Sequence, residues 1–249
     1  MRTIVHLSDL HFGRTDPATL EPLRACLARL APHLLVVSGD LTQRARPAQF
    51  RQARAYLDTL PGPQLVVPGN HDVPLYDLFS RFLSPFGRFR RLIGQDLQPV
   101  FVDDEIAVLG VNTARGLALR GGRVSKAQIA GLRAALRALD RRLTRILVSH
   151  HPFDVTAKGC GADVVLAGHL HAGYAGALGG VGVSAIVVQA GTATSRRTRG
   201  SPNSFNVLRV APGHIEIDEY SLAREGFACS RRHVFDHASG VWVGSHGPA

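Results

Sequence analysis

The sequence predicts an α/β protein of 249 residues in which two packed β-sheets form a single domain. In the first third, short apolar runs alternate with stretches of helical periodicity, a pattern typical of βαβ units and a largely parallel sheet. In the last third, short apolar alternations are separated by Gly and Pro, which is typical of antiparallel strands. We therefore expect a parallel-rich sheet from the first half and an antiparallel-rich sheet from the second.

The elements follow from apolar spacing and from the residues that begin and end each run. Pro47 favours a helix start, Ser125 is a plausible helix cap, and Pro85 and Gly87 should split the helical stretch 75–97 into two. The predicted helices are 19–30, 47–60 and 125–142, and the predicted strands are 2–8, 34–37, 65–67, 100–102, 106–111, 146–148, 164–166, 175–178, 184–189, 204–210, 214–220, 232–235 and 241–243. Residues 203–249 are thus expected to form a β-rich closing segment that frays over 245–249.

The composition indicates a soluble chain with a sizeable core, since 45% of residues are hydrophobic and 19% are charged. The three cysteines, Cys26, Cys160 and Cys229, lie far apart and without CxxC spacing, so neither a disulfide framework nor a cysteine zinc site is predicted. The first apolar run is too short for a signal peptide, and no run is long enough to span a bilayer. We expect a cytoplasmic protein without a membrane span; the sequence leaves homo-oligomerisation open.

The net charge of +10 comes almost wholly from arginine. Such a balance is typical of proteins that bind nucleic acid or another polyanion. The arginines are scattered, however, and only 6% of residues are aromatic, so no base-stacking pattern is visible. Nucleic acid is therefore a partner that the charge permits but does not favour.

Five predicted strands end in polar side chains of one chemical kind. Because the carboxyl ends of parallel strands gather at one edge of a sheet, we expect these side chains to share a crevice. Two carboxylates, an amide oxygen and several imidazoles suit Mn, Fe or Zn better than Ca or Mg, which prefer oxygen ligands. The residues are Asp9 and His11, Asp40, Asn70 and His71, His150, and His169 and His171.

The spacing of these residues predicts how they divide between ions. Alternate residues of an extended strand end point the same way, so Asp9 and His11, and likewise His169 and His171, should each grip one ion. The Leu inside each pair should face the core. Eight ligand-type residues are too many for one ion, and Asp40 is the natural bridge between two because a carboxylate has two oxygens.

Each motif alone also has a plain structural interpretation. The Asp9 motif could be a capped turn, Asp40 a common strand ending, the stretch 69–72 a surface turn, and His150 and His151 a buried pair beside a turn. Their joint occurrence at five strand ends favours the metal site.

The ordered motifs Asp-x-His, Gly-Asp, Gly-Asn-His-Asp, a later His and Gly-His-x-His run from Asp9 to His171. In these motifs the sequence resembles the calcineurin-like metallophosphoesterase superfamily, and most closely its class III cyclic-nucleotide phosphodiesterase branch. The resemblance implies a four-layer αββα sandwich of two mixed β-sheets flanked by helices. It also implies a single metallophosphoesterase domain over residues 1–249, with 75–97 as a helical insert near the site.

The resemblance further implies two divalent or trivalent metal ions, Mn, Fe or Zn, and one catalytic histidine, His71. It assigns Asp9, His11, Asp40 and His171 to one ion, and Asp40, Asn70, His150 and His169 to the other. Related enzymes often place a longer insert between His151 and Gly168, whereas 153–162 is short and without helical period here. We therefore expect any cap over the site to be built differently, and family substrate preferences to transfer poorly.

The implied activity is hydrolysis of a small phosphodiester, with 3',5'-cyclic nucleotides as candidates, by in-line attack of a metal-bridging hydroxide. His71, oriented by Asp72 or by a backbone carbonyl, would steady the transition state or protonate the leaving alkoxide. Asp72 could instead only cap its turn. The alternatives are a nuclease or phosphomonoesterase on the same centre and, from another class, a low-activity metal-binding interaction scaffold.

Substrate contacts are expected from Arg14, His151, Arg196 and Arg197. The basic run 196–199 could meet a substrate phosphate, although a solvated loop explains it as well. His151 could touch substrate or support His150, which is the interpretation that we favour. Arg115 is a weaker candidate.

Overall fold

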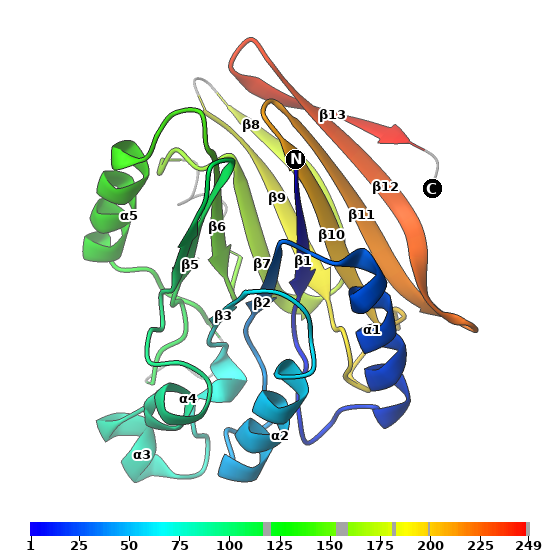
Figure 1. Ribbon diagram of the computed structural model, residues 1–249. Helices are drawn as coiled ribbons and strands as arrows, with labels where there is room; N and C mark the ends of the chain where they lie inside the picture. The colour runs from blue at the N-terminus through cyan, green and yellow to red at the C-terminus, as the bar shows by residue number, and fades with distance from the viewer. Residues whose placement is uncertain (117–120, 153–158, 181–182, 199, 248–249) are drawn as a thin grey trace.

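Two β-sheets lie face to face in the computed structural model, with helices on both outer faces (Figure 1). The structure describes residues 1–116, 121–152, 159–180, 183–198 and 200–247. Helices α1 (Pro17–Leu30) and α2 (Pro47–Leu57) pack on one sheet, and α5 (Lys126–Ala138) packs on the other. The predicted four-layer αββα sandwich is confirmed.

The seven-stranded sheet combines a parallel part with an antiparallel extension. Strand β1 (Arg2–Leu7) pairs in parallel with β2 (Leu34–Ser38), which pairs in parallel with β3 (Gln64–Val67). On its other side, β1 pairs antiparallel with β10 (Ser204–Ala211). The sheet continues through three antiparallel strands, β11 (His214–Ala223), β12 (Gly226–Ala238) and β13 (Val241–Gly247).

The six-stranded sheet has a parallel centre and antiparallel edges. Its strands are β4 (Val100–Val102), β5 (Ile106–Val111), β6 (Thr144–Ser149), β7 (Val164–His171), β8 (Tyr174–Gly180) and β9 (Val183–Gly191). Strands β5, β6, β7 and β9 are parallel neighbours, whereas β4 joins β5 and β8 joins β9 antiparallel.

Both sheets are therefore mixed, the six-stranded one with mostly parallel and the seven-stranded one with mostly antiparallel pairings, but the expectation that each sheet comes from one half of the chain is wrong. Strand β10 from the last third pairs with β1 from the beginning of the chain. Antiparallel strands extend an edge that is still unpaired, and each sheet offered such an edge. Sequence order does not decide which edge they join.

The alternation of apolar side chains along the strands fills three layers of core. Ile4 and Val36 face the other sheet, where they meet Val108 of β5 and Val148 of β6. The alternate residues of β1 and β2 point the other way, towards α1 and α2. The outer layers are formed by Val5, Val37, Leu23, Leu27 and Phe50 on the α1–α2 side, and by Leu109, Leu147 and Leu136 on the α5 side.

Several predicted boundaries differ from the observed ones. Ser125 caps α5 by accepting the N–H of Gln128 at 3.2 Å, as predicted, but the helix ends at Ala138. Asp140 forms a local turn there by accepting the N–H of Arg142 at 2.9 Å. Fraying from residue 245 is wrong, because β13 continues to Gly247 in register with β12. Residues 248–249 and most of the expected irregular stretch 153–162 lie outside the described residues.

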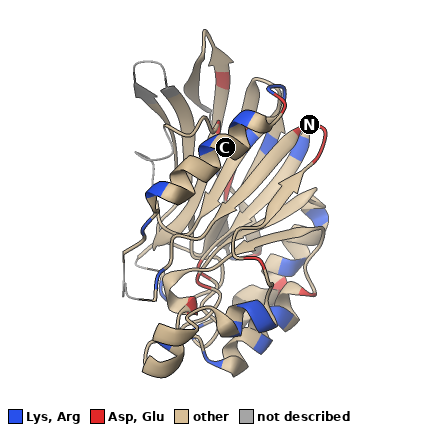
Figure 2. Cartoon of the chain, turned by 90° about the vertical axis from the view of Figure 1, so that its left-hand side faces the viewer, with Lys and Arg blue, Asp and Glu red and all other residues tan. Residues whose placement is uncertain are grey.

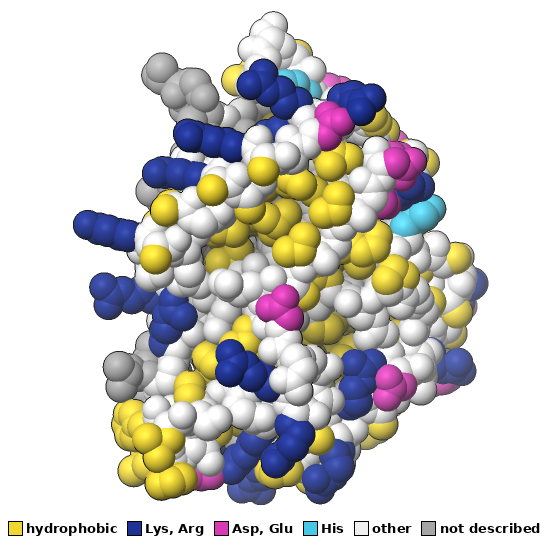
Figure 3. Space-filling view, turned by 60° about the vertical axis from the view of Figure 1, so that its left-hand side comes forward, with side chains coloured by type: hydrophobic (Ala, Val, Ile, Leu, Met, Phe, Trp, Pro, Cys, Tyr) yellow, Lys and Arg dark blue, Asp and Glu magenta, His cyan; other side chains and the backbone are white. Residues whose placement is uncertain are grey.

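The predicted split of the helical stretch 75–97 is confirmed by α3 (Leu78–Leu83) and α4 (Gly87–Leu92). Helix α4 is anchored by Phe89, which is fully buried and packs edge-on against Phe50 of α2 at 6.3 Å. Helix α3 instead exposes apolar side chains, visible as a yellow group at the lower left of Figure 3.

Charge is concentrated outside the sheets. Lys and Arg lie mostly on helices and connecting loops, while the central strands are largely uncharged (Figure 2). None of the helices in the described part of the chain has the length and apolar character needed to cross a bilayer.

Candidate metal centre

The predicted site residues come together where strand ends of the two sheets meet. Asp9 follows β1, and its Oδ2 accepts the backbone N–H of His169, at the end of β7, at 3.0 Å. The N–H of Gly168 donates to the carbonyl of His150, after β6, at 3.0 Å. The expectation of a crevice at the edge of one sheet is thus corrected, because the site lies between two sheets.

The backbone of the site residues is unusual. Of the eight non-glycine residues with positive φ in the described part of the chain, five belong to the predicted ligand set. The left-handed region is unfavourable for side chains with a Cβ, and such conformations cluster at functional sites. The five residues and their φ angles are Asp9 (55°), His11 (49°), Asp40 (53°), His169 (72°) and His171 (60°).

These angles correct the assumption of extended strand ends. His169 and His171 do not point to one place, since His171 lies beside His11 and His169 lies beside His150. The two intervening leucines also differ, because Leu10 is fully buried whereas Leu170 is 43% exposed.

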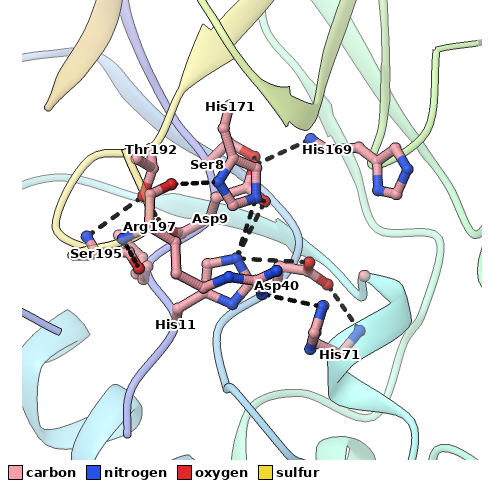
Figure 4. A network of polar contacts seen from close by, with 12 residues as sticks. Ser8, Asp9, His11, Asp40, His71, His169, His171, Thr192, Ser195 and Arg197 are labelled. Carbon is pink, nitrogen blue, oxygen red and sulfur yellow. Dashed lines mark hydrogen bonds and ion pairs between the residues drawn. The ribbon is translucent and has the colours of Figure 1, made fainter. Parts of the chain in front are cut away.

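Three buried residues form what we call the enclosed set: Asp9, His11 and His171 (Figure 4). Asp9 Oδ1 lies 3.1 Å from His171 Nε2 and 3.4 Å from His11 Nε2. The two Nε2 atoms lie 3.3 Å apart. His171 is oriented by its Nδ1–H, which donates to the Arg197 carbonyl at 2.7 Å, so that Nε2 faces Asp9 and His11.

A second group, the open set, consists of Asn70, His150 and His169. His150 Nε2 lies 3.1 Å from Asn70 Oδ1 and 3.3 Å from His169 Nδ1. The ring is oriented by Nδ1–H, which donates to the Ser38 carbonyl at 2.8 Å. Asn70 and His169 are partly exposed, in contrast to the enclosed set.

Asp40 lies between the two sets. Its Oδ1 accepts the backbone N–H of His71 at 2.8 Å. Its Oδ2 lies 3.3 Å from His150 Nε2 and 3.8 Å from His11 Nε2. One oxygen is therefore fixed by the backbone, and the other faces an imidazole of each set.

Glycines allow the approach of these loops. A Cβ on Gly69 would lie 2.1 Å from Asp40 Oδ1, and one on Gly168 would lie 1.8 Å from the Ser8 hydroxyl. Gly69 has φ −104°, which any residue can adopt. Its small size is thus needed for the close approach to Asp40, and not for a backbone angle that only glycine adopts.

Burial and charge pull the pKa values of the site residues in opposite directions. Burial alone would raise the pKa of Asp9, but the nearby imidazoles of His11 and His171 hold it well below its usual range. Burial would lower the pKa of His150, but the charge of Asp40 outweighs it and raises this pKa to about 9. Burial, followed by the charge of His150, lowers the pKa of His169 to about 4.

His71 stands beside both sets with one face towards a cleft. Its Nδ1–H donates to the Gln43 carbonyl at 2.9 Å, so a backbone carbonyl orients it. Its Nε2 accepts from Arg197 Nη1 at 3.3 Å. Burial is the main cause that lowers the pKa of His71, and a neutral ring agrees with an Nε2 that accepts from a guanidinium.

Asp72 lies behind the site and ties two loops together. Its carboxylate accepts the N–H groups of Leu41, Thr42 and Gly69 at 3.2, 2.9 and 2.9 Å. Burial, then the charge of Asp40, raises the pKa of Asp72 to about 6. These contacts agree with the turn-cap alternative for Asp72.

A cleft of about 1060 Å³ opens over the open set and His71. Of the predicted substrate contacts, Arg14 and Arg197 line it. Arg196 lies outside its lining, with a 66% exposed side chain 3.9 Å from Asp16. Residue 199 of the basic run lies outside the described residues.

Two other predicted contacts are not part of the described lining of the cleft, although a His151 nitrogen lies within 4.8 Å of those of His150 and His169. His151 packs against the rings of His150 and His169, and its Nδ1 lies 2.8 Å from the Thr113 hydroxyl. Arg115 contacts Gln128 on α5. The position of His151 agrees with support of the neighbouring histidines.

Sequence reasoning missed Arg44 and Arg46, which also line the cleft, and the Gln43 carbonyl that orients His71. A signal was present, because these residues follow Asp40 closely and precede the helix start at Pro47. A loop at the carboxyl end of a strand that already supplies a ligand is a place to look for substrate contacts.

The donor atoms fit metal binding. Asp9 Oδ1 is buried, and no hydrogen-bond partner is found for it among the described residues, although two imidazole nitrogens face it. Donors about 2.0–2.1 Å from a common ion are about 2.8–3.0 Å apart in octahedral and about 3.3–3.4 Å apart in tetrahedral geometry. The separations of 3.1–3.4 Å within the two sets lie in this range. Mixed oxygen and imidazole donors suit Mn, Fe or Zn.

Known proteins with similar sequences include phosphodiesterases. The chain is 29% identical to the 3',5'-cyclic adenosine monophosphate phosphodiesterase CpdA of Escherichia coli, over 60% of this chain and 55% of that protein. It is 34% identical to the glycerophosphodiester phosphodiesterase GpdQ of Enterobacter lignolyticus, over 28% of this chain and 29% of that protein. The matches span less than two thirds of the length of these curated relatives.

A similar fold occurs in the purple acid phosphatase PPD1 from yellow lupin seeds. The TM-score is 0.68 at 12% identity, covering 92% of this chain and 52% of that one, so the likeness concerns the fold alone. The family model described as calcineurin-like phosphoesterase matches residues 2–173, which is more than half of the chain. The motifs, the two-sheet sandwich and this match together lead to one conclusion: the chain belongs to the calcineurin-like phosphoesterase family.

Proposed function

We propose that residues 1–249 form a single metal-dependent phosphoric ester hydrolase domain that cleaves phosphodiesters. The observation that carries this proposal is the position of Asp40, whose Oδ2 lies 3.3 Å from His150 Nε2 and 3.8 Å from His11 Nε2. A carboxylate shared by two donor sets is what a two-metal site requires. Ions bound there would activate water and neutralise charge on the phosphate.

Each donor set would hold one ion, with Asp40 common to both. The proposed ligands are Asp9, His11, His171 and Asp40 for the first ion and Asn70, His150, His169 and Asp40 for the second. Asn70 would contribute an oxygen without adding charge. His150 and His171 fit this role because their Nδ1–H groups are committed to backbone carbonyls, which leaves Nε2 as the donor atom.

His71 would act on the substrate through Nε2. Because Nδ1–H is committed to the Gln43 carbonyl, proton exchange with the leaving oxygen is confined to the atom that faces the cleft. Arg197 holds this nitrogen through Nη1 and would also attract a non-bridging oxygen of the phosphate.

A phosphodiester is the favoured substrate because the relatives CpdA and GpdQ are named for phosphodiesters. A 3',5'-cyclic nucleotide is the first candidate, on the resemblance to the cyclic-nucleotide branch. A nuclease is the second, and one observation favours it: four arginines line the cleft, which suits a polyanion.

The proposal is tested by a panel assay of the protein loaded with manganese. The substrates are an aryl phosphomonoester, bis(p-nitrophenyl) phosphate, cyclic AMP, and single-stranded DNA and RNA. We expect the diesters to be cleaved faster than the monoester. Cleavage of the monoester alone would replace the proposal with a phosphomonoesterase.

The matched control is His71→Ala, which removes the proposed catalytic ring but none of the proposed ligands. We expect it to retain bound metal and to lose about 10²–10³ in kcat. No hydrolysis by metal-loaded wild type, together with unchanged metal content in both forms, would favour an interaction scaffold.

A further inference from the structure

The loop 43–46, which joins β2 to α2, forms one wall of the cleft. Gln43, Arg44 and Arg46 all line the cavity, and so does Gln49 from the first turns of α2. The Gln49 side chain holds the loop, because its Oε1 accepts the N–H of Arg44 at 2.9 Å and that of Arg46 at 3.4 Å. The two arginines are thus positioned through their main chain.

The residue between the two arginines is strained. Ala45 has φ 50°, in the region where a Cβ is unfavourable, and it is fully buried. Its N–H donates to the Thr42 hydroxyl at 3.0 Å, and its carbonyl accepts from Arg88 of α4 at 3.0 Å. A strained residue held from both sides indicates that the direction of its neighbours matters.

The helical insert buttresses this wall. Arg88 also pairs with Asp77, whose carboxylate caps α3 through the N–H of Ser80 at 3.0 Å. On the cleft side, the Arg44 guanidinium lies 5.8 Å from the centre of the Tyr76 ring, within cation–π range. The loop that carries Arg44 and Arg46 is therefore held in place by α2 and by the helical insert, and is not a freely solvated loop.

The charge of the cleft exceeds what one phosphodiester needs. Its described lining contains Arg14, Arg44, Arg46 and Arg197 but no Asp or Glu. Arg197 contacts His71 next to the metal centre, whereas Arg44 and Arg46 belong to a separate loop. A volume of about 1060 Å³ is also at the upper limit of the roughly 300–1,000 Å³ typical of small-ligand pockets.

We propose that Arg44 and Arg46, with Arg14 on the same cleft, form a second anion subsite that binds a further phosphate of the substrate. The substrate class is then a phosphodiester that carries at least one phosphate besides the scissile one. This inference deepens the proposed function and rests on it, because the metal centre would bind the scissile group. The further phosphate could be a terminal phosphate or the next diester of an oligonucleotide.

The test compares two ligands that differ by one phosphate. Thymidylyl-(3'→5')-thymidine has only the scissile diester, and its 5'-phosphorylated form adds one terminal phosphate. Their dissociation constants are measured by calorimetry at low salt with manganese-loaded protein that carries His71→Ala to limit turnover. We expect the phosphorylated form to bind about tenfold more tightly. Equal affinities would overturn the proposal.

Two variants assign the preference to the subsite. The double variant Arg44→Gln/Arg46→Gln should reduce the affinity ratio between the two dinucleotides to less than about twofold. The double variant Arg90→Gln/Arg91→Gln should keep the ratio measured without these substitutions. The second pair removes the same charge from two exposed residues outside the cleft. An equal loss in both pairs would indicate general electrostatic attraction and overturn the proposal. The single variant Arg46→Gln, at an exposed side chain, should lose part of the preference even if the double variant does not fold.

A third ligand separates the two sources of the phosphate. Trithymidylate without a terminal phosphate offers a second diester in place of the terminal group. Tighter binding of the trinucleotide than of the phosphorylated dinucleotide would assign the subsite to a polynucleotide backbone, and the reverse order to a terminal phosphate. Absence of turnover with manganese would refute the proposed function, while the binding preference would still decide the subsite.

Discussion

The two donor sets of the metal centre differ in depth. Asp9 and His11 of the enclosed set are fully buried and His171 is 4% exposed, whereas Asn70 and His169 of the open set line the cleft. The main chain of the enclosed set is also held by hydrogen bonds. The Thr192 hydroxyl donates to the Asp9 carbonyl at 2.7 Å, and the Thr194 hydroxyl donates to the Leu10 carbonyl at 2.9 Å. Among the described residues, the cleft therefore opens over the open set and not over the enclosed set.

This difference indicates a division of work. A buried, fixed set would hold its ion firmly and position the shared carboxylate. A set at the floor of the cleft would exchange a bound ion with solvent more easily and would face the substrate. The same contrast orders the following predictions. Changes at Asp40, which is shared, should affect metal binding by both sets, whereas changes at the arginines that line the cleft should affect only substrate binding and turnover.

The largest effect is expected for Asp40→Asn, because Asp40 is shared by both donor sets and its substitution should disable both at once. The amide oxygen can still accept the His71 N–H, so the loop contact at 2.8 Å is retained. The shared negative oxygen is lost. We expect activity to fall about 10³-fold and bound metal to fall at both sites, measured by kinetics and by elemental analysis after dialysis. A variant that keeps two metals per chain and folds normally would contradict a bridging role.

The next effect separates the sets directly, through His171→Ala and His169→Ala. Removing His171 leaves Asp9 Oδ1 with one fewer imidazole in a buried place, so we expect loss of one ion that excess manganese does not restore. Removing His169 from the open set should weaken one ion about 10–100-fold, and millimolar manganese should restore activity. Equal rescue of both variants would show that depth does not govern ion retention.

The sequence predicted the family and the gathering of these side chains, because both depend on motifs of local order. Apolar runs that end in Asp, Asn or His indicate strand ends, and the ordered motifs identify the family and its two-sheet sandwich. The structure brings the predicted ligand residues into two groups around Asp40. Which residues share an ion was stated from the resemblance, and stays a proposal.

What the sequence could not show depends on how the two sheets stack. Spacing alone grouped His169 with His171, and only the family resemblance separated them. The left-handed backbone angles that direct the two side chains apart leave no signal in the spacing. Arg44 and Arg46 reach the cleft because Gln49 and Arg88 fix their loop, and Arg88 lies more than forty residues away. Such contacts between distant segments leave no periodic pattern.

A smaller effect concerns pH, and it should appear only in metal-free protein. The charge of Asp40 raises the pKa of His150 to about 9 against burial, above the roughly 6.5 of an unfolded chain. The folded state therefore holds this proton more strongly, and its stabilisation is complete below pH 6.5 and lost as pH rises through 9. We expect the unfolding midpoint of metal-free protein to fall by on the order of 10 °C over this range.

Two controls assign this fall to the open set. His150→Gln cannot take up the proton, so its midpoint should stay level between pH 6.5 and 9. Metal-loaded wild type should also stay level, because a bound ion takes the place of the proton. A fall of the same size in His150→Gln would place the titration elsewhere.

The smallest effect is expected from the comparison of Arg197→Gln, at an arginine that lines the cleft, with Arg196→Gln, at its exposed neighbour. Arg197 lines the cleft and donates to His71, whereas Arg196 is 66% exposed beside Asp16. The carbonyl of residue 197 that orients His171 belongs to the main chain and survives the substitution. We expect kcat/KM to fall about tenfold for Arg197→Gln and less than twofold for Arg196→Gln.

The pH profile tells whether Arg197 acts through His71. Burial is the main cause that lowers the pKa of His71, and the charge of Arg197 lowers it further. Removing that charge should move the His71 limb of the kcat/KM profile to higher pH, which loss of a simple phosphate contact would not do. An unshifted limb in Arg197→Gln would leave Arg197 as a substrate contact only. A shift in Arg196→Gln as well would indicate that the charge of the whole basic loop, and not one guanidinium, sets the pKa of His71.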